Sequence, residues 1–212
     1  MRKIASLVAA AVLLSIASAG LSLAQQAPAA AGQGAGGAGR GGAAAPPPPP
    51  FRITSPDLVD GSQIPTKFTC AAGAEAVSPA LQWTNAPRGT LSFVLIVHDM
   101  EPRPQRKLDD ILHWMVWNIP PNATRYPQGV PSNTADLPDG SHQTNGNPGN
   151  GGITGYRPPC PPQNVPQPHH YAFDMFALDA KVDLETATRA DVMKAIDGHI
   201  LGHDSLVVPF NR

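Results

Sequence analysis

The sequence is poor in charge, in aromatic side chains and in cysteine. Of its 212 residues, 15% are charged, 6% are aromatic and two are cysteines. Beyond residue 50 lie all 16 acidic residues and, since Arg2, Lys3 and Arg40 come earlier, 12 of the 15 basic ones, a net charge of −4. This part of the chain has no basic stripe to neutralise phosphates, which argues against a nucleic acid partner.

Several catalytic signatures are also missing. The chain contains no G-x-S-x-G nucleophile turn, no phosphate-binding P-loop and no Cys/His zinc pattern. His199 and His203 have the spacing of a helical metal pair, but Gly198 and Gly202 disfavour a helix there and no Glu follows the first His. We therefore expect no catalytic nucleophile, no bound metal and no cofactor.

No apolar run is long enough to span a membrane. The best candidate, Ile4–Ile16, follows a basic N-terminus and precedes small residues suited to cleavage, which is the layout of a secretory signal peptide. We predict a signal peptide over 1–24, export to the periplasm or the medium, and no transmembrane anchor in the mature chain. Residues 25–50 are mostly Ala, Gly, Gln and Pro, which predicts a disordered linker.

Residues 51–212 suffice for one domain, and their pattern is mainly that of strands. Leu91–Val97 and Ile111–Ile119 are apolar throughout and predict largely buried strands, and Tyr171–Leu178 alternates between two faces. Shorter extended segments are predicted at 51–54, 64–70, 81–83 and 205–210. Short strands separated by turn signals indicate an antiparallel β-sandwich.

One helix and one long irregular segment complete the prediction. Thr188 and Asp191 have the spacing of an N-terminal cap, and Val192, Ile196 and Ile200 follow at intervals of four as an apolar stripe. Gly198 or Gly202 is expected to end this helix. The segment 136–168 is dominated by Gly, Pro, Asn and Gln, and so long a loop in a small domain is usually functional or mobile.

The polar residues around the two buried strands are the main candidates for a site. Asp99 and Glu101 follow the first strand and face the same side if the chain is extended, whereas His98 and Asp99 face opposite sides. His113 begins the second strand, where a merely solvated imidazole is less expected. Two adjacent carboxylates can grip a cation or act as acid and base, or they are simply solvated loop charges.

Two further pairs leave alternatives open. His169 and His170 precede the alternating strand, so only one of them can share a pocket with Tyr171, or both are solvated. Cys70 and Cys160 are candidates for a disulfide in an exported chain, and two small buried thiols are the alternative.

Three ordered motifs carry a family resemblance: HDMEPRP, LHWMVWNIP and GITGYRPPCPPQNVPQPHHYAFDMFALD. The chain resembles the phosphatidylethanolamine-binding protein (PEBP) family, in its bacterial Raf-kinase-inhibitor-like branch, over nearly all of 51–212. The resemblance implies a sandwich of two antiparallel sheets with helices near the C-terminus and a small anion pocket at one end. It does not carry kinase inhibition to an exported chain.

The same resemblance implies the residues of the pocket. By position they are Asp99, Glu101, His113, Pro162, His169 and Tyr171. It also implies a cis peptide bond at Pro159, Pro161 or Pro162. The chain departs from the family where Phe210 occupies the place of a tyrosine over the pocket, which removes a hydroxyl donor.

We therefore expect an exported binding module for a small anion or phosphorylated head group similar to phosphoethanolamine, with a protein partner that it regulates. A zwitterionic head group would place its ammonium against the carboxylates and its phosphate against the histidines, so affinity should rise as histidines gain protons near pH 6. One alternative is a metal-dependent or acid/base hydrolase that uses the same Asp/Glu/His cluster. Another is a pure protein-interaction module that works through the 136–168 loop.

Overall fold

The computed structural model describes residues 46–101, 110–146, 152–164 and 166–212. The predicted signal peptide, most of the predicted linker and parts of the 136–168 loop lie outside these residues. Pro46–Arg212 form one compact unit. Within the described ranges, no helix has the length and apolar character needed to cross a membrane.

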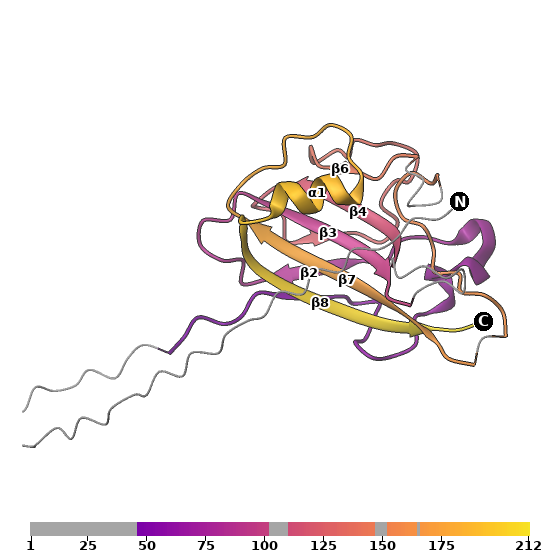
Figure 1. The fold of residues 1–212 in the computed structure, drawn as a ribbon. Helices are drawn as coiled ribbons and strands as arrows, with labels where there is room; N and C mark the ends of the chain where they lie inside the picture. The colour runs from indigo at the N-terminus through magenta and orange to yellow at the C-terminus, as the bar shows by residue number, and fades with distance from the viewer. Residues whose placement is uncertain (1–45, 102–109, 147–151, 165) are drawn as a thin grey trace, which may run out of the picture. The chain divides into compact units, whose positions relative to one another are not determined.

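Two antiparallel sheets build this unit (Figure 1). The smaller sheet has the order β1-β2-β5, made of Arg52–Thr54, Leu81–Thr84 and Arg125–Tyr126. The larger has the order β6-β4-β3-β7-β8, made of His142–Gln143, Ile111–Ile119, Ser92–Asp99, His169–Leu178 and Ile200–Phe210. The prediction of a mainly β, two-sheet antiparallel fold is therefore confirmed.

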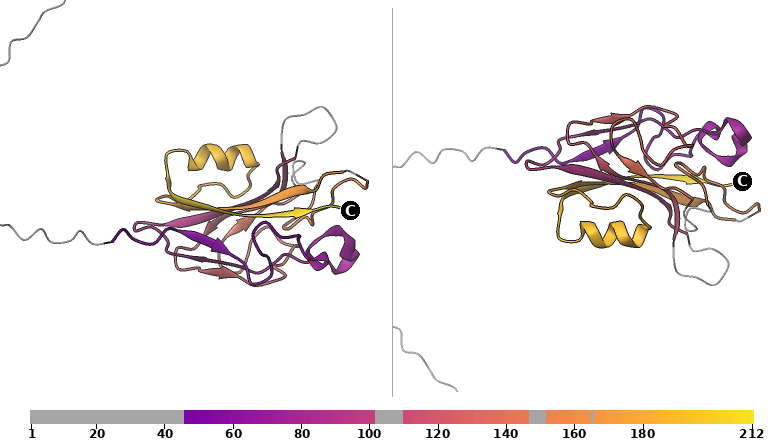
Figure 2. Two further views of the ribbon diagram at one scale, coloured as in Figure 1. Left: turned by 90° about the horizontal axis from the view of Figure 1, so that it is seen from below. Right: turned by 90° about the horizontal axis from the view of Figure 1, so that it is seen from above.

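The larger sheet is covered on both faces, and this explains its long apolar strands. One face packs on the smaller sheet through Phe93, Leu95 and Val97 of β3, while Val94 and Ile96 belong to a second cluster with Val192 and Ile196 of the helix α1 (Arg189–Ile196). Figure 2 shows α1 and β2 on opposite sides of the larger sheet. Because side chains alternate along a strand, a strand between two apolar layers must be apolar at every position.

The helix begins where the sequence predicts and ends just before Gly198, the first of the two glycines expected to end it. The Thr188 hydroxyl accepts a bond from the Asp191 N–H (3.2 Å), and the Asp191 carboxylate accepts one from the Thr188 N–H (2.9 Å), which is a capping box. Gly198 then adopts a φ of +81°, which favours glycine and turns the chain. The prediction that Ile200 continues the apolar stripe is wrong, because Ile200 starts β8 opposite Leu178 and is 45% exposed.

Residues 64–70, predicted to be extended, fold instead into short helical turns. Two 3-10 helices occupy Thr66–Phe68 (η1) and Cys70–Glu75 (η2). The Thr69 hydroxyl accepts a bond from the Ala71 N–H at 3.2 Å, and such local bonds compete with strand pairing. The last strand also starts earlier than the predicted 205, and the long loop contributes β6, which pairs with Val116 and Trp117 of β4.

Candidate functional site

The end of β3 gathers most of the predicted site residues. Asp99 is the last residue of β3 and lies opposite Ile111 of β4 and Tyr171 of β7. Because both neighbours run antiparallel to β3, its C-terminal end meets their N-terminal ends. Residues at the end of β3 therefore meet residues at the starts of β4 and β7 at one edge of the sheet, although these segments are far apart in the sequence.

A bulge in β4 places His113 in this site. Val97 lies opposite Trp114 and His98 opposite Leu112, so His113 is the extra residue between the two pairs. A bulge re-aims a side chain that strict alternation would send elsewhere. The His113 side chain is buried, at 3% exposure, and its ring meets the Tyr171 ring edge-on at 5.1 Å between centroids.

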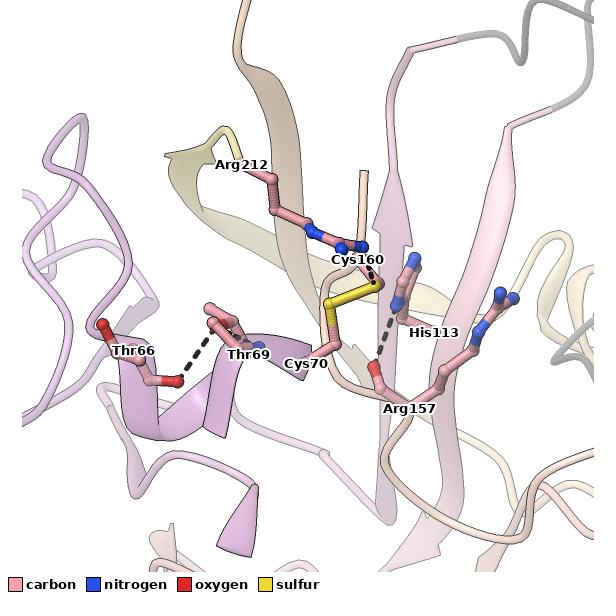
Figure 3. The surroundings of a disulfide bond; sticks show 8 residues. Thr66, Thr69, Cys70, His113, Arg157, Cys160 and Arg212 are labelled. Atoms are coloured by element: carbon pink, nitrogen blue, oxygen red, sulfur yellow. Dashed lines mark hydrogen bonds between the residues drawn. A yellow bond between two sulfur atoms is a disulfide. The ribbon is translucent and has the colours of Figure 1, made fainter. Parts of the chain in front are cut away.

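The orientation of His113 is set by a neighbouring loop. Its Nδ1 lies 2.8 Å from the carbonyl oxygen of Arg157, and the Arg157 N–H donates to the His113 carbonyl at 2.8 Å (Figure 3). Since a carbonyl oxygen only accepts, Nδ1 carries the proton in this contact. The loop thus fixes both the direction of the ring and its tautomer.

The two predicted carboxylates each contact one of two consecutive histidines. Asp99 Oδ2 lies 2.7 Å from His169 Nδ1, and Glu101 Oε1 lies 2.6 Å from His170 Nδ1. Glu101 Oε2 also accepts the His170 N–H at 2.5 Å, and Asp99 Oδ1 accepts the Glu101 N–H at 3.1 Å. His170 was not among the predicted site residues; its adjacency to His169 was the available signal, but strand alternation argued against its use.

The pKa values of the two carboxylates shift in opposite directions, because burial outweighs the histidine contact at Asp99 but not at Glu101. Burial raises the pKa of Asp99, and the negative charge of Glu101 adds to this against the lowering effect of His169. Burial alone would also raise the pKa of Glu101, but the bonds from the more exposed His170 outweigh it and the net direction is down. Asp99 is therefore the carboxyl group that more readily holds a proton.

Tyr171 contributes a hydroxyl that the described residues leave unsatisfied. The side chain is fully buried, and its oxygen has no partner with hydrogen-bond geometry in the described part of the chain. Burial raises the pKa of Tyr171, and Asp99 raises it further through its charge and through a side-chain contact that lacks full hydrogen-bond alignment. An unsatisfied buried hydroxyl costs about 1–3 kcal/mol, so this atom marks a place where a ligand would restore a bond.

Three other predictions concern the loop around Cys160. Pro162 is exposed in the loop after Cys160, and no bond or ring contact among the described residues joins it to the other five. Cys70 and Cys160 form a disulfide with a Cα–Cα distance of 5.3 Å. The predicted cis peptide is wrong: Pro159, Pro161 and Pro162 are described, and no described bond is cis, in keeping with the general preference of X-Pro bonds for trans.

Behind the site, His98 faces the other side of the sheet as predicted. Its Nε2 lies 2.9 Å from Asp174 Oδ2, and its Nδ1 lies 2.6 Å from Asp110 Oδ2. The Asp110 contact is close but lacks hydrogen-bond alignment, so Asp174 is the better partner. Ser205 bonds Asp174 and Arg189 pairs with Asp110, so this network connects α1 and the residue before β4 with β3, β7 and β8.

Asp99, Glu101 and His169 could also hold a divalent cation. Each offers one ligand atom, and these atoms lie within 4.8 Å of one another. Two surface cavities lie elsewhere: one of about 340 Å³ beside Trp117 and Thr188, and one of about 580 Å³ beside Pro50 and Pro87. None of the six predicted site residues lines either cavity.

Comparison with known proteins finds relatives for nearly all of the β-rich part of the chain. A sequence model described as phosphatidylethanolamine-binding protein matches residues 54–211. A UPF0098 protein of Methanothermobacter thermautotrophicus is 38% identical over 154 residues, which cover 72% of this chain and 93% of that protein. The UPF0098 protein YbhB of Escherichia coli K12 is 32% identical over 165 residues, covering 76% of this chain and 99% of YbhB.

A solved structure extends the comparison to three dimensions. The crystal structure of E. coli YbcL, described as a member of the mammalian PEBP family, superposes with a TM-score of 0.65 at 28% identity. The match covers 76% of this chain and 98% of YbcL. The resemblance inferred from the three sequence motifs is confirmed.

Proposed function

Because the chain belongs to the phosphatidylethanolamine-binding protein family, we propose that it is an exported module that binds a small anion or phosphorylated head group at the Asp99 end of its larger sheet. Membership supports a binding module rather than the hydrolase or loop-only alternatives. The observation that carries the choice of site is the buried, unsatisfied hydroxyl of Tyr171, a residue whose ring contacts His113 and whose hydroxyl is affected by the charge of Asp99.

The charges of the site suit a ligand with both signs. A bare phosphate would be repelled by two carboxylates, whereas an ammonium group would be attracted to Glu101, whose pKa is lowered. Burial raises the pKa of Asp99, and a protonated carboxyl can donate to a phosphate oxygen instead of repelling it. The Tyr171 hydroxyl would donate to the phosphate, and so would Nε2 of His113 in its imidazolium form, in which both ring nitrogens carry protons.

A ligand titration followed by NMR tests this proposal. We expect phosphoethanolamine to shift the side-chain signals of His113 and His169, more strongly at pH 6 than at pH 7.5 and more strongly than phosphate or acetate at equal concentration. The physical reason is that only phosphoethanolamine can neutralise the carboxylates and use the phosphate-binding donors together. The protein should be stripped of metal beforehand, so that no cation occupies Asp99, Glu101 and His169.

Two results would contradict the proposed site. The first is no histidine shift at millimolar phosphoethanolamine. The second is an equal response to acetate and phosphoethanolamine, which would indicate a general anion surface. A stoichiometric divalent metal in protein purified without chelator would instead favour the hydrolase alternative.

Export is tested separately by the mass of the mature protein. We expect a bacterial host to deliver the chain outside the cytoplasm, with a new N-terminus shortly after residue 19 or 24, because small residues precede both positions. Leu13→Arg, which places a charge in the apolar segment, should leave the full chain inside the cell. Recovery of uncleaved wild-type protein from the cytoplasm alone would count against export.

We further propose that occupancy of the site is communicated to a protein partner. The His170 and Glu101 side chains are partly exposed at the edge of the site, at 45% and 32%, so a partner could contact them directly. Variants at these two positions should then affect partner binding without removing the buried donors His113 and Tyr171.

A further inference from the structure

The disulfide between Cys70 and Cys160 belongs to the loop that orients His113. Arg157, whose carbonyl accepts the His113 Nδ1 bond, lies three residues before Cys160, and Pro158 and Pro159 stiffen the connection. Cys70 is the first residue of η2. The bond therefore holds the histidine-supporting loop against η2, as Figure 3 shows.

Other contacts hold the same loop without the disulfide. The Cys70 N–H donates to the Pro159 carbonyl at 3.0 Å, and the Tyr156 hydroxyl donates to the Phe68 carbonyl at 2.9 Å. Neither bond requires joined sulfur atoms. Opening the disulfide removes the covalent restraint on the loop around Arg157, so we expect this loop to loosen while the remaining bonds keep it near η2 and the two-sheet fold intact.

The disulfide is also open to chemical attack. Cys160 is exposed and Cys70 is partly exposed. The Arg212 guanidinium lies 3.0 Å from Cys160 Sγ (Figure 3). A positive charge at this distance attracts an incoming thiolate and stabilises a thiolate on Cys160 once it forms.

We propose that Cys70–Cys160 is a thiol-exchange site through which reduced thiols control ligand affinity at His113. Its effect on affinity rests on the proposed function, whereas its effect on His113 itself does not. The disulfide reacts with an external thiolate, which either a monothiol or a dithiol can supply.

The exchange proceeds in two balanced steps. A thiolate attacks the exposed Cys160 sulfur, forms a mixed disulfide and expels Cys70 as a thiolate, which takes a proton from water. A second thiolate attacks the external sulfur of the mixed disulfide and releases Cys160 as a thiolate beside Arg212. Two electrons pass from two external thiols to the protein disulfide, and the thiols leave joined as a disulfide.

Reduction should weaken phosphoethanolamine binding by about tenfold, the lower end of the effect seen when a group that orients a liganding histidine is lost. The test compares oxidised protein with protein reduced by dithiothreitol or by glutathione, with the redox state confirmed by alkylation and mass. The ring-nitrogen signals of His113 in ligand-free protein should move on reduction, because the bond to Arg157 loosens. The rest of the backbone spectrum should persist.

Arg212→Gln is the matched variant for the chemistry. Removal of its positive charge should slow reduction by glutathione several-fold at low salt and leave the affinity of the oxidised protein unchanged. Reduction of Arg212→Gln at the wild-type rate would overturn the role of the guanidinium. Cys70→Ser with Cys160→Ser should reproduce the reduced state permanently, and reduction of the wild type remains decisive if this variant fails to fold.

The outcomes separate the two proposals. If the oxidised protein binds no phosphoethanolamine, the proposed function fails, and the His113 signals of ligand-free protein still decide the exchange proposal. Full reduction with unchanged His113 signals and unchanged affinity would overturn it. General loss of the backbone spectrum on reduction would also overturn it, because the disulfide would then serve only to hold the fold together.

Discussion

Replacing His113 by asparagine should weaken phosphoethanolamine binding by about 10- to 150-fold, because a charge-assisted hydrogen bond contributes roughly 1.5–3 kcal/mol. Asparagine carries its amide nitrogen near the place of Nδ1, so it can still donate to the Arg157 carbonyl. It has no counterpart of Nε2, the nitrogen that we assign to the ligand. The variant therefore separates ligand contact from loop support.

The complementary variant is His113→Gln. Glutamine places its amide nitrogen near Nε2 and gives up the bond to Arg157, so it should retain more affinity than asparagine while loosening the loop. His199→Ala is the control, since His199 is half-exposed, pairs with Asp179 and precedes the opposite end of β8. Calorimetric titration of all three would contradict the assignment if asparagine bound as well as the wild type, or if His199→Ala weakened binding equally.

The strands of the larger sheet could be predicted because burial leaves a simple pattern. Ile111–Ile119 has the predicted bounds, and Val94 and Phe93 are both apolar because each face of β3 meets a core. Alternation likewise separated His98 from Asp99 correctly. Where burial and side-chain alternation determine the residue types of a strand, a single sequence is enough to predict that strand.

The site depends on features that alternation does not encode. His113 reaches Tyr171 through a bulge, and a bulge is set by how β4 pairs with β3 rather than by either sequence alone. Glu101 lies beyond the end of β3, so its contact with His170 follows from the path of the chain after the strand. The family resemblance named His113 and Glu101, but only the structure shows how they are positioned.

The assignment of Ile200 to the apolar stripe of the helix failed for a related reason. Spacing of four residues described Val192 and Ile196 correctly, but Gly198 redirects the chain before the third position. Pairing of Ile200 with Leu178 then gives the backbone a partner that the helix would not have offered. The turn at Gly198 and the strand pairing of Ile200 therefore outweighed the helical spacing of the apolar residues.

Replacing His98 by alanine should lower the free energy of unfolding by about 1–3 kcal/mol, because it leaves the part-buried Asp174 carboxylate without its hydrogen bond to His98 Nε2. The His98 and Asp174 side chains are only 12% and 17% exposed, and His98 also faces Asp110. Without the imidazole, two carboxylates remain close together with Arg189 as the nearby cation on α1. Urea unfolding at pH 7 measures the loss, and His199→Ala, which breaks a half-exposed pair with Asp179, should change stability by less than about 1 kcal/mol.

The pH dependence gives this network a sharper test through Asp174. Burial alone would raise the pKa of Asp174, but the bonds from His98 and Ser205 outweigh it and hold the pKa below the ordinary value of 3.8. The folded state therefore gains stability from ionised Asp174 above that value and loses it as the pH falls through the lower folded pKa. Asp174→Asn should be less stable than the wild type at pH 7, and the difference should shrink below about pH 4 because the wild type alone loses this contribution. A difference that stays constant between pH 7 and pH 3 would show that Asp174 does not owe its stabilising effect to its charge.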